Sequence, residues 1–130
     1  MLRTGPWLAW RYRLKGFGIF AANDWHVDVW KGRVGNKQNY SFVYSQGPDG
    51  KPISSRGYEA IRQGVQEYKR LYVLKKLGAD IKMLDMPVDV AISRDGLGAS
   101  VETFDSVRSQ LDRMLASFHN MNNRKKGNFP

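Results

Sequence analysis

Two long segments of the chain repeat their apolar residues with the spacing of an amphipathic helix. Over residues 58–77, the repeat runs through Tyr58, Ile61, Val65, Tyr68 and Tyr72. Over residues 100–120, it runs through Phe104, Val107, Leu111, Met114 and Phe118. Steps of three and four residues bring such positions onto one side of a helix. Both segments are therefore predicted to be helices that turn this side, tyrosines included, towards a core.

Residues suited to helix ends flank these segments. Ser54 or Ser55 can cap the first helix, because a serine hydroxyl accepts from a free backbone N–H. Gly78 can end that helix, since glycine adopts a left-handed conformation easily. A shorter helix is predicted near the N-terminus, where Pro6 suits the first position and Gly16 suits the end. Its apolar side comprises Trp7, Trp10 and Leu14.

Two further segments have the composition of β-strands. Residues 17–22, FGIFAA, are almost wholly apolar, which is typical of a strand buried on both faces of a parallel sheet. Residues 40–45, YSFVYS, are rich in aromatic and β-branched side chains. The polar residues 23–39 between them are predicted to be a long loop, and Pro48-Asp49-Gly50 is predicted to be a turn. A crossover between the two strands favours a parallel arrangement.

Residues 79–98 carry a mixed signal. Pro87 argues against a continuous helix interior, whereas residues 88–93, VDVAIS, alternate like a short strand. The predicted order is helix, strand, strand, helix and helix, which gives an α/β fold class with α+β as the alternative. Two strands make an incomplete sheet. We therefore expect a partner, or a larger parent protein, to complete it.

Composition and charge narrow the classes of function. The chain has 130 residues and no cysteine, which indicates one domain and excludes disulfides, thiol nucleophiles and cysteine-based zinc sites. No apolar run reaches about 18 residues, so no membrane span is expected. The N-terminal apolar run is too short for a signal peptide, which favours the cytoplasm. The formal charge of +9 includes a run at 124–126, within a tail (residues 121–130) that is predicted to be disordered after a domain over residues 1–120.

The most distinctive polar cluster directly follows the first predicted strand. It supplies the candidate substrate-binding residues Asn23, Asp24, Trp25 and Trp30. Aromatic faces stack on sugar rings, and neighbouring polar groups bind hydroxyls, so the cluster suits the rim of a carbohydrate site. The alternative is that both tryptophans anchor the loop to the core. His26 and His119 have no companions at metal-ligand spacing, so neither a metal site nor a cofactor is predicted.

One helical segment carries a recognisable motif. The sequence SRGYEAIRQGVQEYKRL resembles the pattern S-x-R-x-E-A-x-R-x-G-x-x-D-Y-x-x-L of the C-terminal segment of glycoside hydrolase family 123-like proteins. The matching positions are Glu59, Ala60, Arg62, Gly64, Tyr68 and Leu71. Glu67 replaces the usual aspartate, and Gly57 stands where an arginine is expected. In addition, WLAWRYRLKGFGIFAANDW is similar to the family's tryptophan-rich helix and strand, and FDSVRSQLDRMLA is similar to its final helix.

The resemblance implies a TIM-type barrel, of which this chain would supply the last βα units. Active sites of such barrels lie where strands end, which is where Asn23, Asp24 and Trp25 would stand. The family is expected to remove N-acetylhexosamine with an adjacent Asp-Glu pair on an earlier strand. No such dipeptide occurs here, so no catalytic residue is assigned.

The resulting expectation is a non-catalytic region or remnant of a glycoside-hydrolase-like barrel that contributes aromatic and polar contacts to a sugar. It is expected to form a homo-oligomer or to pair with the missing half of the barrel. The alternative is a small basic interaction protein without a carbohydrate role, and this alternative includes binding to nucleic acid.

Overall fold

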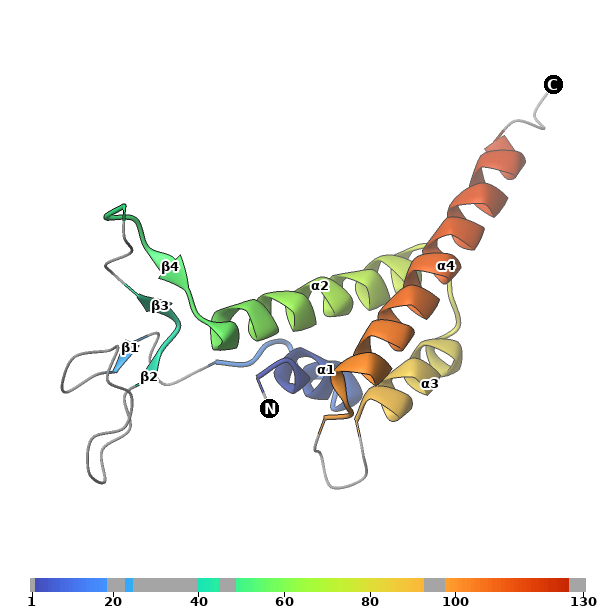
Figure 1. Ribbon diagram of the computed structural model, residues 1–130. Helices are drawn as coiled ribbons and strands as arrows, with labels where there is room; N and C mark the ends of the chain where they lie inside the picture. The colour runs from blue at the N-terminus through green and yellow to red at the C-terminus, as the bar shows by residue number, and fades with distance from the viewer. Residues whose placement is uncertain (1, 19–22, 25–39, 45–48, 93–97, 127–130) are drawn as a thin grey trace.

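The computed structural model describes residues 2–18, 23–24, 40–44, 49–92 and 98–126. These residues form four helices: α1 (Thr4–Arg11), α2 (Arg56–Lys76), α3 (Ile81–Ala91) and α4 (Val101–Lys126). They also form four short strands: β1 (Asn23–Asp24), β2 (Tyr40–Ser41), β3 (Val43–Tyr44) and β4 (Ile53–Ser54). Figure 1 shows the helices gathered in one group and the strands beyond the N-terminal end of α2. At this coarse level the fold is mixed α/β and mostly helical.

The core lies between the four helices. α1 packs against α2 and α3, and α4 packs against the same two helices. The buried cluster comprises Trp7, Trp10, Leu71, Leu74, Ala79, Leu84, Val88, Ala91, Ile92, Phe104, Val107 and Leu111. The apolar stripe predicted for the last helix is confirmed, because three of its members are buried and Met114 and Phe118 pack at the edge of the cluster.

The helix α2 is confirmed, but its buried side differs from the prediction. The residues of α2 that are buried are Gly64, Glu67, Leu71 and Leu74. Tyr58 and Tyr72, which were expected in the core, are 43% and 48% exposed. The physical reason is that α1 approaches α2 closely at Gly64. The side of α2 that carries Gly64, Glu67 and Leu71 therefore faces the core. The ends of α2 agree with the prediction: the Ser55 hydroxyl accepts from the Tyr58 N–H, and Gly78 has a left-handed φ of +92°.

The helix α3 corrects the prediction for residues 79–98, because it continues through Pro87. Proline gives up one backbone hydrogen bond within a helix. Here Pro87 is buried together with Leu84 and Val88, so packing against the core offsets that loss. The Asp80 carboxylate also caps α3 by accepting from the Lys82 N–H at 2.7 Å. Tertiary packing therefore decides between helix and strand in this segment.

The strands differ from the predicted parallel pair. β1 pairs with β2 and β3 pairs with β4, and both pairs are antiparallel. Of the predicted turn, Asp49 and Gly50 lie within the described residues, and Gly50 has a left-handed φ of +73°. A connection as short as the one from β3 to β4 joins antiparallel strands, because parallel strands need a crossover of a dozen or more residues. The residues expected to form the first strand, 17–22, fall largely outside the described part of the chain.

The helix ends at the two termini also differ from prediction. α1 ends at Arg11, well before Gly16, because Arg13 adopts a left-handed φ of 55°. The Arg13 guanidinium donates to the Trp10 carbonyl oxygen at 3.0 Å, which holds this turn. α4 continues to Lys126, beyond the predicted end at Asn120 and into the predicted tail. No proline or glycine interrupts the chain there before Gly127.

Candidate functional site

The predicted sugar-binding residues are placed only in part. Asn23 and Asp24 form β1, where Asn23 pairs with Ser41 and Asp24 pairs with Tyr40 of β2. Their backbone is therefore part of a strand pair and not of the loop that the sequence predicts. Trp25 and Trp30 lie outside the described residues. The structure thus places the backbone of Asn23 and Asp24, and the sugar-binding role of all four residues stays a prediction.

A buried charge cluster lies between α1, α2 and α4, and it comprises Arg3, Trp7, Glu67 and the half-exposed Asp105. Glu67 has no solvent exposure. Its carboxylate accepts from Arg3 Nε at 3.0 and 3.2 Å, from Arg3 Nη2, and from Trp7 Nε1 at 2.7 Å. Arg3 Nη2 also donates to Asp105 Oδ1 at 3.1 Å. The cluster therefore links three helices through one guanidinium.

Burial and charge act in opposite directions on Arg3. Burial alone would lower the pKa of Arg3, but the Glu67 and Asp105 carboxylates together raise it above its ordinary value. The guanidinium therefore stays charged over the whole physiological range. It also lies over the Phe104 ring, at 4.7 Å from the centroid, which is within the range of a cation–π contact. No described buried side-chain polar atom lacks a hydrogen-bond partner.

The cluster can form because α1 lies very close to α2 at Gly64. A Cβ atom at this position would overlap the Arg3 carbonyl oxygen and would meet Pro6 Cγ at 3.0 Å. The absence of a side chain at Gly64 lets the start of α1 rest on the α2 backbone. One turn further along α2, Glu67 then comes within reach of both Arg3 and Trp7.

A second polar junction joins α1 to α3. Trp10 Nε1 donates to Asp85 Oδ1 at 3.1 Å, and Arg13 Nη2 donates to Asp85 Oδ2 at 2.5 Å. The Trp10 ring also meets the Tyr68 ring edge-on, with centroids 5.7 Å apart. Both tryptophans of α1 are therefore core residues with satisfied N–H groups, and neither is available to stack on a ligand.

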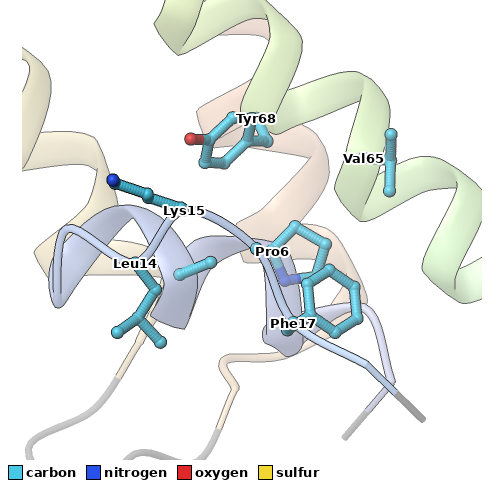
Figure 2. A pocket seen from close by; sticks show the side chains of 8 residues that line it. Pro6, Leu14, Lys15, Phe17, Val65 and Tyr68 are labelled. Atoms are coloured by element: carbon cyan, nitrogen blue, oxygen red, sulfur yellow. The ribbon is translucent and has the colours of Figure 1, made fainter.

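A small apolar hollow lies beside these contacts (Figure 2). It has a volume of about 120 Å³ and lies between Pro6 of α1, the segment Leu14–Phe17, and Val65 and Tyr68 of α2. Small-molecule sites usually have volumes of roughly 300–1,000 Å³, so this hollow is too small for a sugar ring with its hydroxyl contacts. It is of the size that holds one aliphatic or aromatic side chain.

Among the described residues, Glu67 is the one fully buried carboxylate, and its oxygens accept from Arg3 and Trp7. No cluster of three or more histidine, cysteine or acidic residues that could hold a metal ion occurs within the described ranges. Within the same ranges, no helix is both long and apolar enough to cross a membrane.

Comparisons of the chain with family models, with curated proteins and with solved structures found no match.

The sequence patterns did not identify the charged residues that link α1 to the other helices, namely Arg3, Glu67, Asp85 and Asp105. A signal for Glu67 was present, since it falls on the stripe formed by Gly64, Leu71 and Leu74. A charged residue within an apolar stripe of a helix requires a buried partner of opposite charge. Nothing in the local sequence identifies Arg3 as that partner, because the two residues lie 64 positions apart.

Proposed function

We propose that the chain is the non-catalytic C-terminal region, or a remnant, of a glycoside-hydrolase-like protein and that it contributes contacts to an N-acetylhexosamine. The observation that carries this proposal is that the motif residues of α2 contact the tryptophan-rich helix α1. Gly64 lies against the Arg3 backbone, and Tyr68 meets the Trp10 ring. Glu67, at the acidic position of the motif, binds Trp7.

These contacts support the proposal because they explain the spacing of the motif. Three positions of G-x-x-E-Y serve one purpose, which is to fasten α2 to a helix more than 50 residues earlier in the chain. A glycine permits the close approach, an acid accepts from the first indole, and a tyrosine packs on the second. The two segments that resemble the family separately are thus parts of one packed unit.

The same arrangement supports binding without hydrolysis. The two tryptophans of α1 are occupied in the core, so Trp25 and Trp30 are the remaining tryptophans for a sugar. Asn23 and Asp24 precede them on β1 and supply amide and carboxylate groups for hydroxyls. The adjacent acidic pair that the family uses for chemistry is absent from the sequence, so the proposal assigns no catalytic residue to this chain.

The purified chain is expected to bind N-acetylglucosamine oligomers in calorimetry and to leave a fluorogenic N-acetylhexosaminide unhydrolysed. Trp25→Ala should weaken binding by about 1–2 kcal/mol, or roughly fivefold to thirtyfold, because a stacking aromatic is lost. The matched control is Tyr12→Ala, since Tyr12 is an aromatic residue 63% exposed at the end of α1. Hydrolysis at an ordinary enzymatic rate, or equal losses in the two variants, would count against the proposal.

A further inference from the structure

Part of the apolar stripe that the sequence predicted for α2 is exposed in the structure. We call the outer face of α2 the surface formed by Val65, Tyr68, Lys69, Tyr72, Val73 and Lys76. Steps of three and four residues place all six on one side of the helix. Tyr72 and Val73 are 48% and 45% exposed, and Val65 and Tyr68 are half-buried. α2 therefore carries apolar side chains beyond its core-facing side, and of these Tyr68 packs at the edge of the core.

Two hollows run along this face. The outer one, of about 430 Å³, is lined by Val65, Tyr68, Lys69, Tyr72 and Val73. The inner one is the hollow of about 120 Å³ shown in Figure 2, and it shares Val65 and Tyr68 with the outer one. The two hollows adjoin, because Val65 and Tyr68 line both of them, and the outer one is the more open of the two. We refer to this pair of hollows as the groove. A helix that lies in a groove presents its anchors at this kind of spacing.

The charged residues that line the two hollows have one sign, and Asp112, which lies beyond Lys69 and Val73, is paired with Arg70. Lys15 lines the inner hollow, Lys69 lines the outer one, and the Lys76 ammonium lies 5.6 Å from the Tyr72 ring centroid. No acidic residue lines either hollow. Two arginines of α2 have carboxylate partners: Arg62 pairs with Glu59, and Arg70 pairs with Asp112. The lysines of the groove have no such partner among the described residues.

We propose that the outer face of α2 is a docking surface for an amphipathic helix of a partner protein that carries acidic residues beside its apolar anchors. The valines and tyrosines would bury the anchors, and Lys15, Lys69 and Lys76 would pair with the flanking carboxylates. This surface is independent of the sugar-binding proposal, because it uses neither β1 nor the tryptophans that follow it.

The charge pattern favours this occupant over two others. A second copy of the chain, packed α2 against α2, would bring lysines into an interface to which the outer face contributes no carboxylate, and like charges there are unfavourable. A single-stranded nucleic acid would stack a base on Tyr72 and pair its phosphates with the lysines, but it would leave the valines and the apolar hollows uncovered. An acidic helix satisfies both the apolar and the charged parts of the surface.

The test uses a fluorescently labelled synthetic helical peptide with leucines at i, i+4 and i+7 and glutamates beside them. Fluorescence anisotropy should show binding to the full chain. A peptide of the same length with lysines in place of the glutamates should bind at least about tenfold more weakly. Lys69→Glu should weaken binding of the acidic peptide by about tenfold, because an attraction becomes a repulsion.

The matched control is Arg113→Glu, since Arg113 is exposed on α4 and lines neither hollow. It changes the net charge of the protein by the same amount as Lys69→Glu, so it measures non-specific attraction to a chain of charge +9. Equal losses in the two variants, or equal binding of the two peptides, would overturn the proposal. Displacement of the acidic peptide by oligo(dT) would also overturn it. A dimer in light scattering that the Tyr72→Ser substitution abolishes would do the same.

Discussion

Glu67→Ala is expected to lower the free energy of unfolding by about 3–5 kcal/mol, which is the usual consequence of leaving a buried charge without its partner. The substitution removes every contact between Glu67 and the groups of α1, so the Arg3 guanidinium loses its main carboxylate and the Trp7 indole loses its acceptor. Stability of ordinary domains is about 5–15 kcal/mol, so the loss is a large share of it. Urea denaturation should show a lower midpoint with an unchanged slope.

Two further variants separate the charge from the shape at this position. Glu67→Gln keeps an acceptor for Trp7 Nε1 but not the negative charge, so its effect should lie between the wild-type protein and Glu67→Ala. Glu59→Ala removes an exposed acid on the same helix that pairs with Arg62, and it should move the midpoint far less. If Glu67→Ala shifts the midpoint no further than Glu59→Ala, the buried charge cluster does not hold α1 on α2.

Gly64→Ala should also destabilise the protein, although alanine is the better helix former. The helix preference of alanine contributes about 1 kcal/mol in its favour. Against this, the new Cβ atom would overlap the Arg3 carbonyl oxygen, which is a backbone atom and can move only if α1 moves. Overpacking of this kind costs about 1–3 kcal/mol, and displacement of α1 would also weaken the Glu67 contacts. We expect a net loss of about 2 kcal/mol in the free energy of unfolding.

Gly57→Ala is the matched control for this prediction, because Gly57 lies in the first turn of the same helix. A Cβ atom there would meet Leu2 Cδ1 at 2.9 Å, the end of a flexible side chain that can turn away. Because the helix preference of alanine acts here without a backbone clash, the effect of the substitution should lie between no change and a gain of about 1 kcal/mol in the free energy of unfolding. A stabilised Gly64→Ala variant would mean that α1 and α2 are not in close contact in solution.

The helices were the part of the fold that the sequence predicted best. The stripe Phe104, Val107 and Leu111 located α4 and its buried side, and Ser55 and Gly78 marked the ends of α2. The period of α2 was also correct, but periodicity alone cannot decide which of two neighbouring stripes faces inwards. That choice depends on the tight approach at Gly64, a tertiary contact that no local pattern contains.

Other features could not be predicted because they depend on distant partners. Pro87 stays within α3 because core packing offsets a lost hydrogen bond, and Arg13 adopts a left-handed φ while binding Asp85 and the Trp10 carbonyl. Of the candidate site, the sequence named Asn23 and Asp24 but expected a loop in place of a strand. It missed Arg3 entirely, because an arginine near the N-terminus looks like a solvated charge until Glu67 is placed beside it.

The most direct test of the account is a titration of the isotope-labelled chain with N-acetylglucosamine, followed through its four tryptophan indole N–H signals. The signals of Trp7 and Trp10 report on the core, since these groups donate to Glu67 and Asp85. We predict that the sugar shifts the signals of Trp25 and Trp30 and leaves those of Trp7 and Trp10 in place. If no indole signal moves up to the solubility limit of the sugar, or if only those of Trp7 and Trp10 move, the proposed carbohydrate role is wrong.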